Sequence, residues 1–133
     1  MGYTDRFHDE LSQYLPPLTR QSDFDAFWQE TLAQSAAMPL NPRAEPVCYP
    51  GLAAKVYDIV YDGFGGTPIH GWFLVPAFVE NAKYPCLIHY HGFTGSRGTP
   101  SEFMQWISLG AAVLSVDVRG QCGSTGEIGR AHV

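Results

Sequence analysis

The spacing of apolar side chains divides the chain into a helical N-terminal part and a strand-rich remainder. Residues 6–15 favour a short helix, which the proline pair at 16–17 ends. Residues 22–38 carry apolar side chains at the i, i+3, i+4, i+7 spacing of one buried helix face, with Ser22 as the expected N-cap. The side chains of that face are Phe24, Phe27, Trp28, Thr31 and Leu32. Residues 39–50 are interrupted by prolines and are expected to form a connection.

The remainder of the chain contains two kinds of strand pattern. Residues 55–61 and 69–75 are separated by a glycine-rich turn at 62–66, which predicts an antiparallel hairpin. Residues 85–89 and 111–116 are apolar throughout, which is typical of strands buried on both faces.

A helix is predicted between these two apolar strands. Thr99, Pro100 and Glu102 fit the N-cap, N1 and N3 positions of a capping box. The expected buried stripe and the expected stop are Phe103, Met104, Ile107 and Gly110. Strand, helix and strand together make a βαβ unit with parallel strands. A hairpin followed by this unit predicts an α/β fold with a mixed sheet.

Composition narrows the classes of partner and compartment. The 133 residues are 45% hydrophobic and 16% charged, with a formal net charge of −5, which suits one modest globular domain. We find no basic cluster and no apolar run of membrane-spanning length, so neither nucleic acid nor a membrane is an expected partner. Cys48, Cys86 and Cys122 are odd in number and widely spaced, as in a cytoplasmic protein with reduced thiols.

Two glycine-rich segments follow the predicted parallel strands, where reactive loops of open α/β sheets lie. We call residues 91–98 the first glycine loop and residues 117–124 the second glycine loop. A His-Gly pair between a strand and a helix is where α/β-hydrolases place half of their oxyanion hole, and Phe93 N–H is the natural donor after His91 and Gly92. The alternative is that the glycines only form a tight strand-to-helix turn.

A metal site and a nucleotide site fit the sequence less well than this interpretation. His89 and His91 share one strand face, but no further cluster of ligand residues follows, so no metal site is expected. We expect His91 to order the loop by hydrogen bonding and His89 to be a packed strand residue. Residues 120–126 lack the lysine of a Walker motif and the Rossmann glycine spacing, so no nucleotide cofactor is expected either.

Two motifs give the chain a recognisable relationship. HYHGFTGSRG followed by VDVRGQCGS resembles the family of acetyl xylan esterases and cephalosporin C deacetylases, which are α/β-hydrolases, and LPPLTRQSDFDAFWQETLA is similar to that family's N-terminal helical segment. The resemblance implies a serine esterase that removes acetyl groups from small acetylated sugars or related esters. It also implies an enzyme without cofactor or metal that works in the cytoplasm and forms homo-oligomers when complete.

The resemblance also assigns roles to single residues. Phe93 matches a tyrosine of the family whose main-chain N–H forms half of the oxyanion hole, and this replacement leaves the amide in place. Arg119, Gly120 and Gln121 match the family's RGQ motif beside the active-site floor. Arg119 can contact substrate or be a structural partner, for example of Asp117. Cys122 stands where the family has glycine, which is tolerable if its φ is negative.

The catalytic triad of such an enzyme is missing from the sequence. The nucleophile requires a G-x-S-x-G elbow, and Ser96, Ser115 and Ser124 do not fit it. We therefore expect residues 1–127 to be the N-terminal part of one α/β-hydrolase domain, truncated after its early strands and inactive alone. EIGRAHV can be back-translated into the start of a common sequencing adapter, so residues 128–133 are expected to be adapter read as protein.

Three alternatives stay open from the sequence alone. The chain could be a non-catalytic α/β module that binds a ligand through its glycine loops, a pseudogene product, or part of another α/β-hydrolase.

Overall fold

The computed structural model describes residues 3–50, 53–79 and 83–125. The chain divides into two units, Met1–Ala33 and Gln34–Val133. The helices are α1 (Tyr3–Ser12), α2 (Phe24–Ala37) and α3 (Met104–Ser108), with short 3-10 turns at Phe64–Gly66 and Pro100–Phe103. The strands are β1 (Arg43–Val47), β2 (Ala54–Asp62), β3 (Pro68–Pro76), β4 (Cys86–Tyr90) and β5 (Ala112–Val116).

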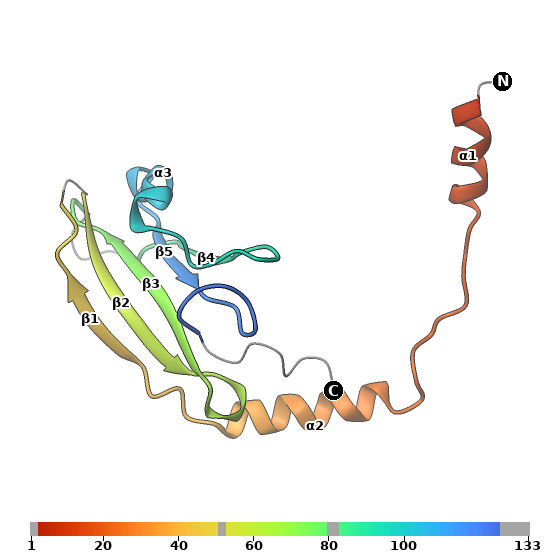
Figure 1. Ribbon diagram of the computed structural model, residues 1–133, viewed down its shortest axis with the longest axis horizontal. Coiled ribbons are helices and arrows are strands. Elements are labelled where there is room, and N and C mark those ends of the chain that lie inside the picture. Colours follow the sequence, from red (N-terminus) through yellow and green to blue (C-terminus); the bar gives the residue numbers. More distant parts are fainter. Residues whose placement is uncertain (1–2, 51–52, 80–82, 126–133) are drawn as a thin grey trace. The chain divides into compact units, whose positions relative to one another are not determined.

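The five strands form one mixed sheet in the order β1-β2-β3-β5-β4 (Figure 1). Strands β2 and β3 form the predicted antiparallel hairpin, with Ala54 opposite Pro76 and Asp62 opposite Pro68. Strands β4 and β5 are parallel, and α3 lies between them in the chain, which confirms the predicted βαβ unit. β5 is inserted between β3 and β4, so it has a neighbour on each side.

The hydrophobic core lies between α3 and one face of the sheet. Val56, Leu74 and Val113 come from the three central strands, and they contact Phe103 and Ile107 of the helical segment. Leu74, Val113 and Ile107 are completely buried, and each such side chain contributes about 1.5–3 kcal/mol through removal from water. The predicted stripe of the helix is therefore confirmed, with Met104 half-buried beside it.

The predicted capping box is present at the start of this helical segment. Thr99 N–H donates to Glu102 Oε1 at 3.1 Å, and Pro100 occupies the first turn. The first turn is a 3-10 turn, and α3 proper begins only at Met104. Gly110 ends the segment with φ of +81°, a conformation that glycine adopts without strain.

Strand β1 was not predicted from the sequence. Its region was expected to be a connection because prolines interrupt it, and Pro46 lies within the strand, opposite Tyr57. A proline has no N–H to donate to a neighbouring strand, but β1 is an edge strand with only β2 beside it, so one side of the strand needs no such donor. The proline therefore fixes the strand's place at the edge rather than excluding the strand.

The prediction that the segment around β4 is buried on both faces is wrong. Ile88 is 53% exposed and Tyr90 is 66% exposed, whereas the neighbouring Leu87 and His89 are half-buried on the side of α3. β4 is an edge strand, and within the described residues only its Leu87 and His89 side packs against the core, where the His89 ring lies beside Phe103. A continuous apolar run shows that a strand is suited to burial on both faces, but it does not supply the covering element. β5 lies inside the sheet and is buried as predicted.

The predicted burial of the α2 face is also wrong. The helix forms over Phe24–Ala37, but none of its residues is buried. Phe24, Phe27, Trp28 and Leu32 are exposed, and Thr31 is half-buried. Amphipathic spacing marks a face that can be buried, but burial itself needs a surface to pack against. Residues 128–133, expected to be adapter-derived, lie outside the described residues.

We predict that Gly71→Ala destabilises the sheet strongly. Gly71 lies in β3 between β2 and β5, and an added Cβ would come within 2.8 Å of the Ser115 carbonyl oxygen and 3.2 Å of Ile59 Cγ1. The free energy of unfolding should fall by about 1–3 kcal/mol, as for other overpacked interiors. Urea denaturation measures this change. Gly92→Ala is the matched control because its Cβ would meet no atom within 4 Å, and equal midpoints for the two variants would contradict the prediction.

Candidate active site

The first and second glycine loops lie next to each other at the carboxyl ends of β4 and β5 (Figure 1). Thr94 N–H donates to Gln121 Oε1 at 2.8 Å, and Val118 N–H donates to His91 Nε2 at 2.9 Å. Parallel strands bring both of their following loops to one edge of the sheet, which is why segments 27 residues apart in sequence are in contact.

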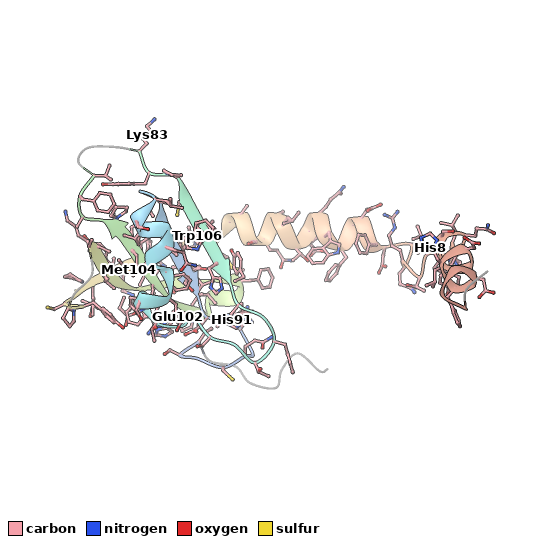
Figure 2. All side chains as sticks on the ribbon, turned by 90° about the horizontal axis from the view of Figure 1, so that it is seen from above. His8, Lys83, His91, Glu102, Met104 and Trp106 are labelled. Atoms are coloured by element: carbon pink, nitrogen blue, oxygen red, sulfur yellow. The ribbon has the colours of Figure 1, made fainter. Side chains whose placement is uncertain are left out.

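His91, labelled in Figure 2, joins the two loops through Nε2 and contacts its own loop through Nδ1. Nε2 accepts the hydrogen bond from Val118 N–H, so it carries no proton. Nδ1 lies 2.8 Å from the Gly92 carbonyl oxygen, and it must donate because a carbonyl oxygen can only accept. The hydrogen bonds therefore select the neutral tautomer with its proton on Nδ1.

A β-turn at residues 92–95 presents the main-chain amide of Phe93. Gly95 N–H donates to Gly92 O at 3.0 Å, and Thr94 at the third position has φ of +62°, as in a type II turn. Gln121 takes the N–H of Thr94, but no described residue accepts a hydrogen bond from the N–H of Phe93. Phe93 is also 89% exposed. The turn thus leaves one main-chain donor open to solvent.

A hollow of about 240 Å³ lies beside this donor. It is lined by Phe93, Thr94, Gly120, Gln121 and Cys122. Gly120 has φ of +70°, whereas Cys122 is not among the described residues with positive φ, so this departure from the family's glycine introduces no backbone strain.

The guanidinium of Arg119 donates to the carbonyl oxygen of Phe64 at 2.8 Å. This bond connects the second glycine loop to the turn of the β2–β3 hairpin. The ion-pair partner that the structure gives Asp117 is Arg97, at 3.7 Å between Nε and Oδ2.

Sequence reasoning missed the centre of this arrangement, which is Asp117. Its side chain is 0% exposed, and its carboxylate accepts hydrogen bonds from Arg97 N–H at 2.6 Å and Ser124 N–H at 2.8 Å. One oxygen therefore holds the first glycine loop and the other holds the second. The available signal was an acidic residue directly after a mostly apolar strand, a position where a buried charge requires a partner.

His89 and Ser115 form a Ser–His hydrogen bond, but it is structural. His89 Nδ1 lies 2.9 Å from Ser115 Oγ, which itself donates to the Arg97 carbonyl oxygen at 2.9 Å. Ser115 is completely buried, and the His89 ring packs 5.2 Å from the Phe103 ring. This hydroxyl is therefore occupied and inaccessible, so it cannot act as a nucleophile.

Over the described ranges, no three His, Cys, Asp or Glu side chains gather closely enough to hold a metal ion. Within the same ranges, no helix has the length and apolar character needed to cross a membrane.

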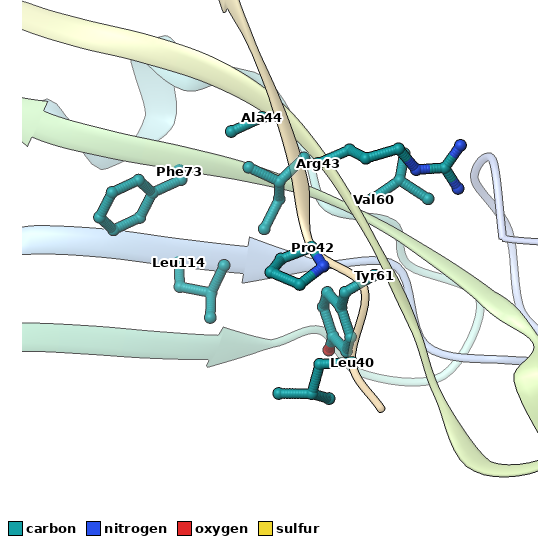
Figure 3. Close-up of a pocket in the computed structure, with 9 residues that line it drawn as sticks. Leu40, Pro42, Arg43, Ala44, Val60, Tyr61, Phe73 and Leu114 are labelled. Carbon is teal, nitrogen blue, oxygen red and sulfur yellow. The ribbon is translucent and has the colours of Figure 1, made fainter. Parts of the chain in front are cut away.

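A larger hollow of about 490 Å³ lies on the sheet face opposite α3 and has an apolar lining (Figure 3). Leu40 and Pro42 from the segment before β1, Tyr61 of β2, Phe73 of β3 and Leu114 of β5 contribute to it. Burial, and to a lesser degree the nearby Tyr90, raises the pKa of the Tyr61 phenol above its ordinary value of 10.0. The phenol is therefore in its neutral form near pH 7.

Comparison with known proteins identifies the family. The sequence model of the acetyl xylan esterase family (AXE1) matches residues 1–132. The chain belongs to the acetyl xylan esterase family. Its five-stranded mixed sheet is part of an α/β-hydrolase fold, as the sequence predicts.

Two solved structures from this family resemble the chain. The acetyl xylan esterase from Paenibacillus sp. R4 is 43% identical, over 90% of this chain and 38% of its own, with a TM-score of 0.76. Acetyl xylan esterase 1 from Thermoanaerobacterium sp. JW/SL YS485 is 26% identical, over 92% of this chain and 38% of its own, with a TM-score of 0.80. The chain thus spans well under half the length of either esterase.

We predict that Tyr61→Phe reduces the loss of stability in alkaline solution. The pKa of Tyr61 is higher in the folded state, so the unfolded chain releases this proton first as pH rises. The stabilisation of the folded state by the protonated Tyr61 phenol is fully present below pH 10.0, and it is lost as pH rises through the folded-state pKa. Urea denaturation between neutral pH and pH above 10 should show a smaller decline for the variant than for the native chain. Parallel declines would contradict the assignment.

Proposed function

We propose that this chain supplies half of the oxyanion hole of an esterase that removes acetyl groups from acetylated sugars or related small esters, a class that includes cephalosporin C. The observation that carries the proposal is the main-chain N–H of Phe93, an exposed residue whose amide has no acceptor among the described residues, at the carboxyl edge of two parallel strands in a chain of the acetyl xylan esterase family. A donor in this position can bind the oxygen that becomes negative during acyl transfer.

The reaction proposed is a serine-type acyl transfer. A serine Oγ adds to the ester carbonyl carbon while a histidine accepts its proton, and the carbonyl oxygen becomes an oxyanion. Collapse of this intermediate expels the alcohol, which takes the proton, and water then releases acetate by the same steps. We assign serine, histidine and acid to the portion of such an esterase that this chain does not cover. Phe93 N–H stabilises the oxyanion in both halves of the reaction.

The remaining site residues support this donor. Gln121 occupies the neighbouring amide of Thr94, and His91 joins the two glycine loops. Gly92 begins the turn, and Arg119 and Gly120 shape the second glycine loop beside the hollow. Because Ser115 is buried and its hydroxyl is occupied, we propose that the 133-residue chain alone hydrolyses no ester.

The same proposal extends to compartment and assembly. Cys48, Cys86 and Cys122 are free and exposed, which supports a reducing compartment, the cytoplasm. The exposed apolar side chains of α2 support homo-oligomerisation of the full-length form. The hollow beside Phe93 and the charge of −5 support a small ester as the substrate rather than nucleic acid or a membrane.

The activity can be tested with a chimera in which residues 1–125 of this chain replace the equivalent segment of the Paenibacillus sp. R4 esterase. We predict that the chimera hydrolyses p-nitrophenyl acetate and acetylated xylose, whereas the 133-residue chain alone does not. Acetate release measures both. A chimera that is folded by thermal denaturation but inactive would contradict the proposal.

Phe93→Pro in this chimera tests the amide itself. Proline has no N–H, and it is favoured at the second position of a type II turn, so the backbone of residues 92–95 can be retained. We predict a kcat about 10²–10³-fold lower, the effect of removing one oxyanion-hole donor. Phe93→Tyr is the matched control because it changes the side chain and keeps the amide, and its kcat should stay within about 3-fold of the parent value. Equal activity of both variants would exclude Phe93 N–H from the mechanism.

A further inference from the structure

We infer that the buried carboxylate of Asp117, with Arg97 as its counter-ion, is a positioning element that determines where the Phe93 N–H points. The inference rests on the proposed function, because it concerns the donor used in acyl transfer. It assigns a role to residues outside the His-Gly and RGQ motifs.

The carboxylate holds the far ends of both glycine loops. Its Oδ1 accepts Arg97 N–H at 2.6 Å, near the end of the first glycine loop. Its Oδ2 accepts Ser124 N–H at 2.8 Å, at the end of the second glycine loop. The beginnings of the two glycine loops are joined by the hydrogen bond that Val118 N–H donates to His91 Nε2 at 2.9 Å. The two loops are thus connected at both ends, and the catalytic amide lies between the two connections.

A chain of contacts leads from Asp117 to the amide of Phe93. The bond to Ser124 fixes the end of the second glycine loop, which carries Gln121. Gln121 in turn accepts the N–H of Thr94, the residue with φ of +62° that follows Phe93 in the turn. A shift of the second glycine loop would therefore rotate the turn and redirect the neighbouring donor.

The site around the carboxylate is closed. Asp117 is 0% exposed, and Gly123 approaches it so closely that a Cβ at this position would collide with the carboxylate. Gly123 also has φ of +111°, which side chains rarely adopt. The second glycine loop therefore follows a path that only glycine permits at this point, and that path places Ser124 N–H on the carboxylate.

Arg97 supplies the positive charge that compensates the Asp117 carboxylate, and three further contacts hold its guanidinium in place. Its side chain is 14% exposed, and its guanidinium lies 4.0 Å from the centre of the Trp72 ring. It also donates to Asp58 Oδ1 at 2.7 Å and to the Gly71 carbonyl oxygen at 2.9 Å. Removal of the Arg97 charge would leave the buried Asp117 carboxylate without its counter-ion, which is strongly unfavourable. The first glycine loop is therefore anchored to β2 and β3 as well as to β5.

Asp117→Asn in the chimera tests the inference. The amide keeps the size of the carboxylate, but its NH₂ group must face a donor, either Arg97 or Ser124, so one loop is released. We expect kcat to fall about 10–100-fold with KM within about 3-fold, because small misplacement of a catalytic group has effects of this size. Affinity for methylboronic acid, which forms a tetrahedral adduct with the serine, should fall by the same factor as kcat/KM.

The boronate measurement separates positioning from stability. A purely structural role lowers the concentration of folded enzyme but leaves KM and boronate affinity of the folded fraction unchanged. Asp62→Asn is the matched control, since this carboxylate accepts from Asn41 at 2.7 Å and forms no hydrogen bond with a described residue of either glycine loop, and its kinetics should equal those of the parent. Unchanged boronate affinity in Asp117→Asn would overturn the inference.

Arg97→Lys serves as a second variant if Asp117→Asn does not fold. It keeps the positive charge and the main-chain bond to Asp117 but loses the planar contact with Trp72 and the paired donors. We expect parallel losses of about 3–10-fold in kcat/KM and boronate affinity, and losses that do not run in parallel would overturn the inference. If Phe93→Pro leaves the kcat of an active chimera unchanged, the proposed function fails. If Phe93→Pro lowers kcat as predicted but the Asp117 and Arg97 variants keep the kinetics of the parent, only this inference fails.

Discussion

The parallel pairing of β4 with β5 is the constraint on which the rest of the site depends. The register places His89 opposite Ser115 and Tyr90 opposite Val116, so both strands end at the same edge of the sheet. The two glycine loops consequently begin side by side, close enough for main-chain amides of one to reach side chains of the other. An antiparallel pair would send these loops to opposite edges, and the hydrogen bonds between them could not form.

The loops show how a main-chain donor can be presented without a dedicated side chain. Three side chains of the site, His91, Gln121 and Asp117, accept main-chain N–H groups, and together they leave the amide of Phe93 open. Thr94 carries the conformational cost with its positive φ, a state of order 1–3 kcal/mol above the common backbone regions for a non-glycine residue. Backbone strain of this kind is typical of functional sites, where surrounding contacts hold an otherwise unfavourable conformation. The side chain at position 93 has little effect on this donor, because the N–H belongs to the main chain.

The uneven burial of the sheet has one physical origin. α3 packs against the face that carries Val56, Leu74 and Val113, and this face is well buried. The opposite face carries Ile88 and Tyr90, which are exposed, and the large apolar hollow. The chain spans 38% of each of the two esterases it resembles, so most of the length of either has no counterpart here. A large exposed apolar patch typically marks a surface that contacts further protein.

The sequence by itself determined the elements whose signals are local. The capping box at Thr99, the hairpin across residues 62–66 and the apolar strand β5 depend on neighbours a few positions away, and the paired loop motifs indicated the family. Only the tertiary structure decided that β1 pairs at the sheet edge despite Pro46, and that one face of β4 and the apolar face of α2 are exposed. It also brought Arg97 to Asp117 and to Asp58, 20 and 39 residues away. The physical reason is that burial and ion pairing depend on which strands become neighbours, and insertion of β5 between β3 and β4 is a long-range choice that no local pattern encodes.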